Sequence, residues 1–345
     1  MLMSDVATRI SLSSVGGSAV DWPAIVCPED GQPLTNSHAE FSCPLGHRWQ
    51  YVRGIPRMIS SSNNYADAFG LQWKVYRETQ LDSYTKTTLS RDRARRCFGE
   101  AGWRMLESGQ RVNVLEVGCG AGRFTEVLLS TQAFVTSVDL SSAVDANQDN
   151  FPQGERHRIL QADVRHLPFA PGQYDVVCCL GVIQHTPSPE ETIEKLWAQV
   201  KPGGMLVIDH YVRDLSWFTK SAPLFRAVLR RLPPDDGLKW TERLVDVFFP
   251  LHRAARNSRI AQALVSRVSP ILTYYHSLPL NDDLQRKWAL LDTHDYLTDW
   301  YKHFRNRPQI TRLLQSLGGV DIWCEYGGNG VEARCRRPLP AAVAH

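Results

Sequence analysis

The central part of the chain alternates short apolar runs with segments of helical periodicity. The apolar runs are rich in β-branched residues and are short enough for strands buried on both faces. They predict strands over residues 112–117, 133–138, 158–162, 174–180 and 205–208. Between them, residues 123–129 and 188–200 place their apolar side chains on one helical face. This alternation predicts an α/β fold in which a parallel sheet carries helices on both faces.

A long insertion separates the end of the sheet from this pattern. A helix is predicted over residues 308–317, and strands over 320–326 and 330–335. Residues 212–307 come before them and combine apolar residues at helical spacing with six prolines. Because a structureless loop of this length is uncommon in a compact domain, the insertion is predicted to be a helical cap over an acceptor pocket.

The first predicted strand ends in a turn with glycines at alternate positions, Gly118, Gly120 and Gly122. Without a Cβ atom, such a turn can be sharp and lets a ligand approach the backbone. The helix that begins at Arg123 adds its N-terminal amides, so the turn suits a ligand carboxylate or phosphate. Arg123 stands where the dinucleotide fingerprint G-x-G-x-x-G has its last glycine. Glu116 suits an amino group better than a pyrophosphate, since like charges would otherwise meet.

The segment Glu116-x-Gly118-x-Gly120-x-Gly122 resembles the first motif of the class I S-adenosylmethionine-dependent methyltransferases, of the methyltransferase domain 11/25 type. The resemblance implies a doubly wound, Rossmann-like sheet of seven strands whose last strand is antiparallel. It also implies S-adenosyl-L-methionine as the cofactor. The cofactor-binding residues expected from the resemblance and the spacing are Glu116, Gly118, Cys119, Gly120, Gly122, Asp139, Leu140, Asp163, Val164, Gly181 and Gln184.

Two aspartates at predicted strand ends are expected to hold the nucleoside of the cofactor. Asp139 lies 19 residues beyond Gly120, near the interval at which an acid reaches a ribose in dinucleotide folds. A helix N-cap or a loop charge is the alternative for Asp139. Asp163 resembles the family's ligand for the adenine amine, with Val164 packing on the ring, and a strand-end cap is its alternative.

Three histidines are candidates for a general base, which accelerates methyl transfer to a hydroxyl group. His185 follows the fourth predicted strand, where ligands of such folds bind. His210 follows the fifth strand, and His294 could reach the pocket from the cap. His185 is the first candidate and His210 is nearly as well placed, but the sequence does not rank the three securely, and His185 could instead shape the pocket through a hydrogen bond to the backbone.

The N-terminal part holds a candidate metal site formed by Cys27, Asp30, Cys43 and His47. Two ligand pairs on two tight turns are typical of a zinc ribbon. With the following Arg53-Gly-Ile-Pro-Arg-Met, the segment resembles the N-terminal zinc ribbon of bacterial ribosomal-RNA guanine methyltransferases. That family has a cysteine at the position of Asp30. The alternative is a ribbon that has lost its metal and is held by aromatic residues.

These features divide the chain into six segments. They are a mobile tail over 1–21, a zinc-ribbon-like segment over 22–60, a helical leader over 61–110, the cofactor-binding core over 111–211, the helical cap insert over 212–307 and the end of the core over 308–337. The leader is expected to close over the cofactor from one side.

Composition and charge set the remaining expectations. The 345 residues are 43% hydrophobic and 22% charged, which is typical of an ordinary globular protein. Neither a secretory signal nor an apolar run long enough for a membrane span is expected, so a cytoplasmic location is predicted. Residues 111–210 carry 7 basic and 12 acidic side chains, whereas residues 211–310 carry 16 basic and 10 acidic ones. The basic, amphipathic segment 217–231 suits either a cap helix or a membrane-surface helix.

The sequence therefore favours a methyltransferase acting on a small acceptor enclosed by the cap. An anionic acceptor is one of the options, and O-, N- and C-methylation are all open. The alternative from the nucleic-acid class is an RNA base methyltransferase that uses the ribbon to bind its substrate. A cofactor-binding scaffold without activity and a nicotinamide dehydrogenase are the remaining alternatives. Oligomeric state and acceptor identity are not predicted.

Overall fold

The computed structural model describes residues 22–37, 39–60, 65–213, 219–328 and 330–340. Its centre is a sheet in the order β7-β6-β5-β8-β9-β11-β10. The strands are β5 (Asn113–Val117), β6 (Phe134–Asp139), β7 (His157–Ala162), β8 (Tyr174–Cys179), β9 (Val200–Tyr211), β10 (Val320–Gly327) and β11 (Gly330–Arg336). Strand β11 is antiparallel to both of its neighbours, as predicted for the last strand. The doubly wound α/β fold is thus confirmed.

The sheet contains more strands than the predicted seven, because the N-terminal segment joins it. Strands β1 (Thr35–Asn36), β2 (Glu40–Ser42), β3 (Arg48–Val52) and β4 (Ile55–Met58) form an antiparallel meander. Strand β4 then pairs in parallel with β7, with Met58 opposite Ala162. Ile55 and Met58 are fully buried by this pairing, so the ribbon extends the sheet to eleven strands instead of standing apart.

Strand β9 begins earlier than the sequence pattern indicates. The Lys201-Pro-Gly-Gly segment, which precedes the predicted strand over 205–208, lies inside the observed strand as an irregularity between two pairs, Tyr174 with Val200 and Val176 with Met205. Gly203 has a φ of +77°, and a Cβ atom on Gly204 would lie 2.8 Å from the carbonyl oxygen of Asp175. Glycine is therefore required by a bulge and not by a turn.

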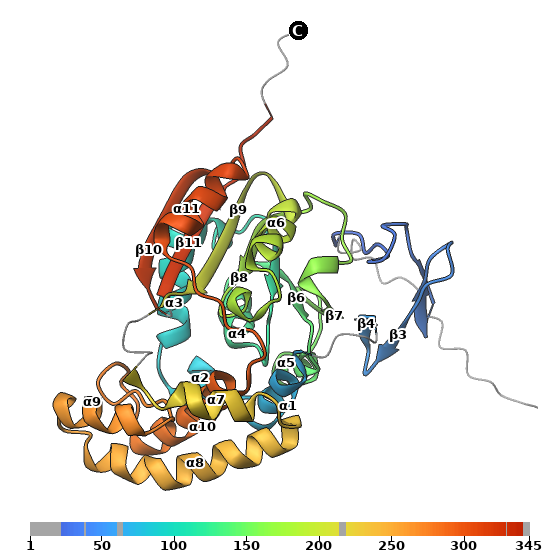
Figure 1. Cartoon of the computed structure of the whole chain (residues 1–345). Helices are drawn as coiled ribbons and strands as arrows, with labels where there is room; N and C mark the ends of the chain where they lie inside the picture. The colour runs from blue at the N-terminus through green and yellow to red at the C-terminus, as the bar shows by residue number, and fades with distance from the viewer. Residues whose placement is uncertain (1–21, 38, 61–64, 214–218, 329, 341–345) are drawn as a thin grey trace, which may run out of the picture.

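Helices cover both faces of the sheet (Figure 1). Helices α3 (Leu89–Leu106) and α4 (Arg123–Leu129) bury one set of alternate strand residues, which includes Val114 and Val176. Helices α6 (Pro189–Gln199) and α11 (Arg307–Ser316) bury the other set, which includes Leu115 and Val177. Helix α5 (Ala143–Asn150) packs against β6 and β7. Each strand is thus apolar on both faces, as its sequence indicates.

The described part of the insertion between β9 and α11 contains four helices, α7 (Ala222–Leu229), α8 (Pro234–Ala254), α9 (Arg259–Val268) and α10 (Asp282–Thr298). Helix α10 packs against α7 and α8, and helix α1 (Asp67–Val75) of the leader contacts both α8 and α10. The leader also contains the short helix α2 (Asp82–Thr85). Figure 1 shows these helices together as a layer at one end of the sheet. The predicted tail over 1–21 and residues 217 and 218 of the basic segment lie outside the described residues.

None of the helices in the described part of the chain has both the length and the apolar composition that crossing a membrane requires.

Candidate functional site

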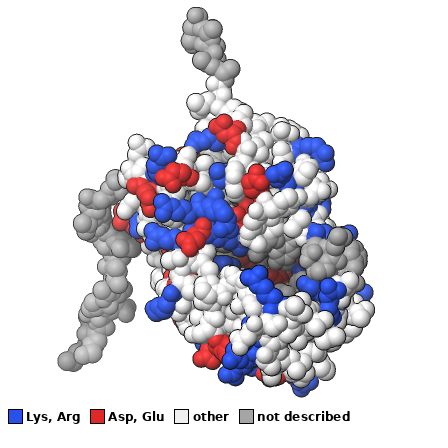
Figure 2. Space-filling model, turned by 90° about the vertical axis from the view of Figure 1, so that its left-hand side faces the viewer, with Lys and Arg blue, Asp and Glu red and all other residues white. Residues whose placement is uncertain are grey.

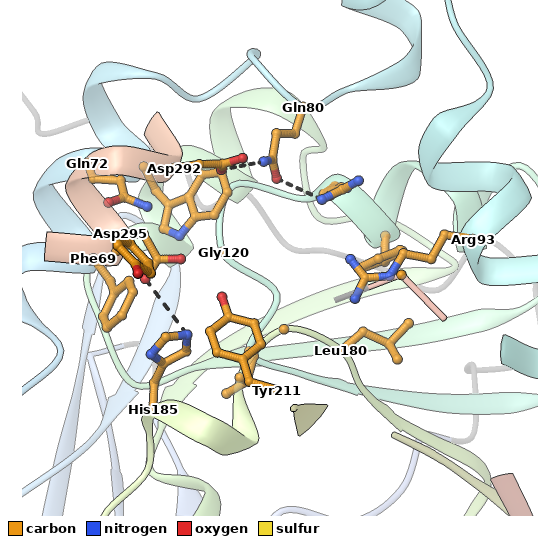
Figure 3. Close-up of a pocket in the computed structure, with 18 of the residues that line it drawn as sticks. Phe69, Gln72, Gln80, Arg93, Gly120, Leu180, His185, Tyr211, Asp292 and Asp295 are labelled. Carbon is orange, nitrogen blue, oxygen red and sulfur yellow. Dashed lines mark hydrogen bonds and ion pairs between the residues drawn. The ribbon is translucent and has the colours of Figure 1, made fainter. Parts of the chain in front are cut away.

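A cavity of about 1010 Å³ lies between the carboxyl ends of the sheet strands and the helical layer. Its floor is the segment 117–121, with Asp139, Leu140, Val164 and Gly181 beside it. Its roof comes from helices α1 and α10 (Figure 3). This volume is at the upper end of the range for pockets that bind a single small ligand, so the cavity can hold two.

The glycine turn lies on the floor of the cavity and requires glycine for two reasons. Gly118, Gly120 and Gly122 all have positive φ values, of +77°, +51° and +102°. In addition, a Cβ atom on Gly118 would lie 2.1 Å from Cγ2 of Val182. The loops after β5 and β8 are therefore in close contact, and this contact sets the shape of the floor. Gly122, by contrast, does not line the cavity and precedes the first residue of α4.

Asp139 lies at the end of β6 and faces the cavity. Its carboxylate accepts hydrogen bonds from the backbone amide of Gly120 at 2.9 Å and from the amide and hydroxyl of Ser141 at 2.8 and 2.7 Å. Burial raises the pKa of Asp139 above its ordinary value. A fixed carboxylate at this edge can accept hydrogen bonds from the two hydroxyls of a ribose.

Three other predicted cofactor residues do not face the cavity. Glu116 is 4% exposed and lies beneath the glycine turn, where Thr125 and Ser137 donate hydrogen bonds to its Oε2 atom at 2.6 and 2.8 Å. Asp163 binds the backbone amide and the guanidinium of Arg165. Gln184 is fully buried, and neither of its amide atoms has a hydrogen-bond partner.

Helix α1 forms part of the roof through aromatic residues. The Trp73 ring lies against the glycine turn, where a Cβ atom on Gly120 would be 3.2 Å from it. The Phe69 ring meets His185 edge-on, with 5.2 Å between the ring centroids. The leader therefore covers this side of the cavity.

His185 is the predicted histidine that reaches the cavity. Its Nδ1 atom lies 3.0 Å from Oδ2 of Asp299, which is at the end of α10. Its Nε2 atom has no hydrogen-bond partner and lies 3.7 Å from Oδ1 of Asp295. Figure 3 shows the Asp295 side chain above the His185 ring, on the same side of the cavity. The cap thus holds one ring nitrogen, and the other is buried beside Asp295 without a hydrogen-bond partner among the described residues.

Asp299 is fully buried and has three basic neighbours. Arg226 on α7 lies 2.9 Å from Oδ1 and Lys302 lies 2.8 Å from Oδ2, in addition to His185. Burial raises the pKa of Asp299, but Lys302, His185 and Arg226 outweigh it and lower the pKa below its ordinary value. Asp299 is therefore an ionised acceptor that fixes the His185 ring. His185, Asp295 and Asp299 could in geometry hold a cation, but two ammonium or guanidinium groups already occupy the Asp299 carboxylate.

The other two candidate histidines are buried away from the cavity. The His210 ring contacts the backbone oxygen of Tyr211 at 2.9 Å through Nδ1. The His294 ring contacts Oε1 of Gln72 at 2.7 Å, and this contact joins α10 to α1. Burial lowers the pKa of each histidine to about 4. Neither residue lines the cavity, so the structure separates them from His185.

The sequence did not reveal the polar residues of the roof. Asp292 accepts hydrogen bonds from Gln80 at 2.9 Å and from the Tyr274 hydroxyl at 2.5 Å. Burial raises the pKa of Asp292 to about 6. Arg123, predicted as the first helical residue after the turn, donates a hydrogen bond to Gln80 at 3.0 Å. The acids of α10 recur at positions 292, 295 and 299, and this helical spacing is the signal that could have indicated them.

Cys27, Asp30, Cys43 and His47 come together in the ribbon, with one potential ligand atom of each within 4.8 Å of the others. His47 Nδ1 lies 3.0 Å from Asp30 Oδ2 and 3.3 Å from Cys43 Sγ. A hydrogen bond from the Gln32 amide is the main cause that lowers the pKa of Asp30 to about 2. Two sulfurs, one imidazole nitrogen and one carboxylate oxygen at these separations fit tetrahedral zinc.

Residues 115–208 match a family described as a methyltransferase domain. The segment is a methyltransferase domain. The match confirms the predicted class I core, and with it S-adenosylmethionine as the cofactor. The methyltransferase domain also fits this molecule, because its cavity floor presents the backbone of the glycine turn, the Asp139 carboxylate and the apolar side chains of Leu140 and Val164.

Curated relatives of the methyltransferase domain are named ubiquinone biosynthesis O-methyltransferase. The protein from Coxiella burnetii is 28% identical over 152 residues, which cover 39% of this chain and 65% of that protein. The protein from Bordetella bronchiseptica is 34% identical over 129 residues, which cover 36% of this chain and 53% of that protein. This chain therefore spans less than two thirds of the length of these relatives. A solved methyltransferase from Methanococcus maripaludis, described as putative, is 12% identical with a TM-score of 0.41, covering 83% of this chain and 100% of its own.

Proposed function

We propose that this chain transfers a methyl group from S-adenosylmethionine to a hydroxyl group of a small acceptor enclosed by the cap. The observation that carries the proposal is a cavity lined by the glycine turn, Asp139 and His185, whose buried Nε2 atom has no hydrogen-bond partner among the described residues. The names of the curated relatives support O-methylation of a small molecule.

The residues of the floor would hold the cofactor. The glycine turn leaves room for its amino-acid end, Asp139 suits its ribose, and Leu140 and Val164 suit its adenine. The bound cofactor supplies an electrophilic methyl carbon on a positively charged sulfur. We propose that Glu116 acts beneath the turn, by fixing Thr125 and Ser137, and does not touch the cofactor.

His185 is proposed as the general base. Its Nδ1 side is held by Asp299, so Nε2 can accept the proton of an acceptor hydroxyl as the oxygen attacks the methyl carbon. Alignment of the two reacting groups and exclusion of water by the roof would supply much of the rate, since positioning alone can be worth ~7–11 kcal/mol.

The charges near His185 favour a neutral hydroxyl over an anionic group at that point of the acceptor. Asp292 and Asp295 both line this side of the cavity, and an anion would meet their carboxylates. Arg93, on the other side of the cavity in Figure 3, is already paired with the buried Asp209. An anionic acceptor, which the sequence left open, is therefore less well supported than a neutral one.

The RNA alternative receives less support from the described residues. The three arginines of the ribbon are each paired with a carboxylate, Arg48 with Glu40, Arg53 with Asp149 and Arg57 with Asp145. A surface that binds phosphates needs unpaired basic side chains. The cap also covers the side of the cavity from which a folded RNA would have to enter.

A test uses the full chain with labelled S-adenosylmethionine and a panel of phenols, catechols, aliphatic alcohols, amines and total RNA. We expect label transfer to a hydroxyl acceptor and a fall of about 100- to 10,000-fold in kcat for His185→Ala. His166→Ala, at an exposed histidine, is the matched control and should keep full activity.

Binding measurements separate the remaining alternatives. Calorimetry with S-adenosylhomocysteine should show binding to the wild type and to His185→Ala alike. Displacement of this ligand by a nicotinamide dinucleotide would favour the dehydrogenase alternative. Binding without label transfer to any of these acceptors would favour a scaffold, and transfer to RNA alone would overturn the small-molecule proposal.

A further inference from the structure

Helix α9 turns the polar side chain of Gln262 toward the protein and a row of apolar side chains toward solvent. Gln262 is buried, and its side chain contacts both the Nδ1 atom and the backbone oxygen of His252, at 2.8 and 2.5 Å. On the outer side, Ile260, Leu264 and Val268 are 76%, 66% and 63% exposed. Surface helices of globular proteins normally show the opposite arrangement, with the apolar face on the core.

This orientation is fixed at both ends of α9. Ser258 caps the first turn by accepting a hydrogen bond from the Ala261 amide at 3.2 Å. At the other end, the amide of Ser221 donates to the Arg267 oxygen at 2.9 Å, and its hydroxyl donates to the Val268 oxygen at 2.8 Å. Rotation of the helix to bury its apolar residues would break these contacts. The exposed apolar row is thus a built feature of the cap.

The chain around this face is strongly basic. Residues 247–281 contain four arginines and no acidic residue. Arg253 is paired with Asp282 at 2.8 Å. Arg256, Arg259 and Arg267 are exposed and form no ion pair with any acid in the described ranges. Arg267 lies beside the apolar row on α9, Arg259 lies on the first turn between this row and Gln262, and Arg256 precedes the helix.

We infer that this outer face of α9, formed by Ile260, Leu264, Val268, Arg256, Arg259 and Arg267, docks onto an anionic lipid bilayer. Apolar side chains that enter the headgroup region, flanked by arginines that meet lipid phosphates, are the features of helices that lie in a membrane interface. A second copy of this chain is the less suitable occupant. A symmetric contact would place the same arginines of both copies against one another.

The position of the face relative to the cavity agrees with this inference. Lys220, before α7, and Leu272 and Leu278, after α9, line the cavity. Figure 2 shows a hollow between the cap and the rest of the molecule, above a cap surface that is mostly white with Lys and Arg side chains. Docking through α9 would therefore keep the cavity near the lipid surface. The inference goes beyond the proposed methyl transfer and does not depend on it.

The test is flotation of the full chain with two kinds of vesicle, phosphatidylcholine alone and phosphatidylcholine with phosphatidylglycerol. We expect flotation with the anionic vesicles and little with the neutral ones. The triple change of Arg256, Arg259 and Arg267 to Gln should weaken the binding on the order of 100-fold, at about fivefold for each arginine.

The apolar row is tested by the combined variant Ile260→Ser, Leu264→Ser and Val268→Ser, which should lose at least tenfold in vesicle binding. All three positions are exposed, so folding should be retained, and circular dichroism checks it. Leu45→Ser, at a position that is 70% exposed in the ribbon, is the matched control and should bind as the wild type does.

Two results would overturn the inference. The first is a wild-type chain that stays in solution with both kinds of vesicle, and the second is binding that the serine and glutamine variants retain. Light scattering that shows a dimer, converted to a monomer by the serine variant, would assign the face to a second copy. Because flotation needs neither cofactor nor acceptor, its failure would leave the proposed methyl transfer in place.

Discussion

The buried carboxyl of Glu116 predicts an unusual dependence of stability on pH. Glu116 lies beneath the glycine turn, and its Oε1 atom has no hydrogen-bond partner among the described residues. Burial raises the pKa of Glu116 from its ordinary value of 4.5 to about 7, although the hydroxyls of Thr125 and Ser137 favour the charged form. Between pH 4.5 and about 7, the folded protein therefore holds a proton on Glu116 that the unfolded chain has already lost.

The sign and size of the effect follow from this difference. A carboxyl whose pKa is raised by folding stabilises the protein most below the unfolded value of 4.5, and this contribution is lost as the pH rises through about 7. At about 1.4 kcal/mol for each pKa unit, the whole difference corresponds to about 3 kcal/mol. Between pH 5 and pH 8, the wild type should lose about 2.5 kcal/mol that a neutral side chain would keep.

The perturbation is Glu116→Gln, because glutamine has the shape of the protonated acid and stays neutral. Urea unfolding of both proteins at pH 5 and at pH 8 gives the free energy of unfolding. From pH 5 to pH 8, the free energy of unfolding of the variant relative to that of the wild type should increase by about 2.5 kcal/mol. Glu155→Gln, at an exposed site, removes the same carboxylate where water already solvates it, and should show little change.

The reasoning would be refuted if the difference in the free energy of unfolding between wild type and Glu116→Gln were the same at pH 5 and pH 8. It would also be refuted if the variant became steadily less stable than the wild type as the pH rose. The second result would mean that the ionised carboxylate is favoured beneath the turn. In that case Thr125 and Ser137 would outweigh the cost of burial, and the direct contact with a cofactor amino group predicted from the sequence would regain support.

Three further predictions concern the floor, the base and the ribbon. Gly118→Ala should destabilise the fold by about 2–5 kcal/mol, from backbone strain and from its contact with Val182, and should weaken S-adenosylhomocysteine binding in calorimetry. Gly181→Ala has similar strain but no close neighbour, so equal losses in the two variants would contradict the contact. Asp299→Asn should lower kcat about 100-fold or more while S-adenosylhomocysteine affinity stays unchanged, because an amide can donate to Nδ1 of His185 and fix the wrong tautomer. An unchanged kcat would remove Asp299 from the proposal. Elemental analysis of the purified chain should find one zinc, and Cys43→Ser should lose it together with several degrees of melting temperature. A fully folded wild type without metal would support the ribbon that has lost its zinc.

The sequence by itself determined the core of the sheet and the floor of the site. Runs such as 112–117 and 174–180 are apolar on both faces. Such a pattern identifies a strand when the local sequence determines the secondary structure. The glycine turn and Asp139 follow the same logic. They lie at the ends of strands whose carboxyl ends meet at one edge of a parallel sheet, so their proximity can be inferred without coordinates.

The tertiary structure decided which residues lie opposite the floor of the cavity. His185 contacts Asp295 and Asp299 because α10 docks over the sheet, and no spacing in the chain expresses that docking. In the same way, His210 and His294 carry the same chemistry as His185, but packing turns them away from the cavity.

Two elements show the physical reason for this division. The pairing of β4 with β7 and the outward apolar row of α9 both depend on which surfaces remain after the larger elements have packed. Hydrophobic periodicity shows which face of a helix or strand is packed against another element. It does not report which element this is, because that choice is made by the packing of the whole chain.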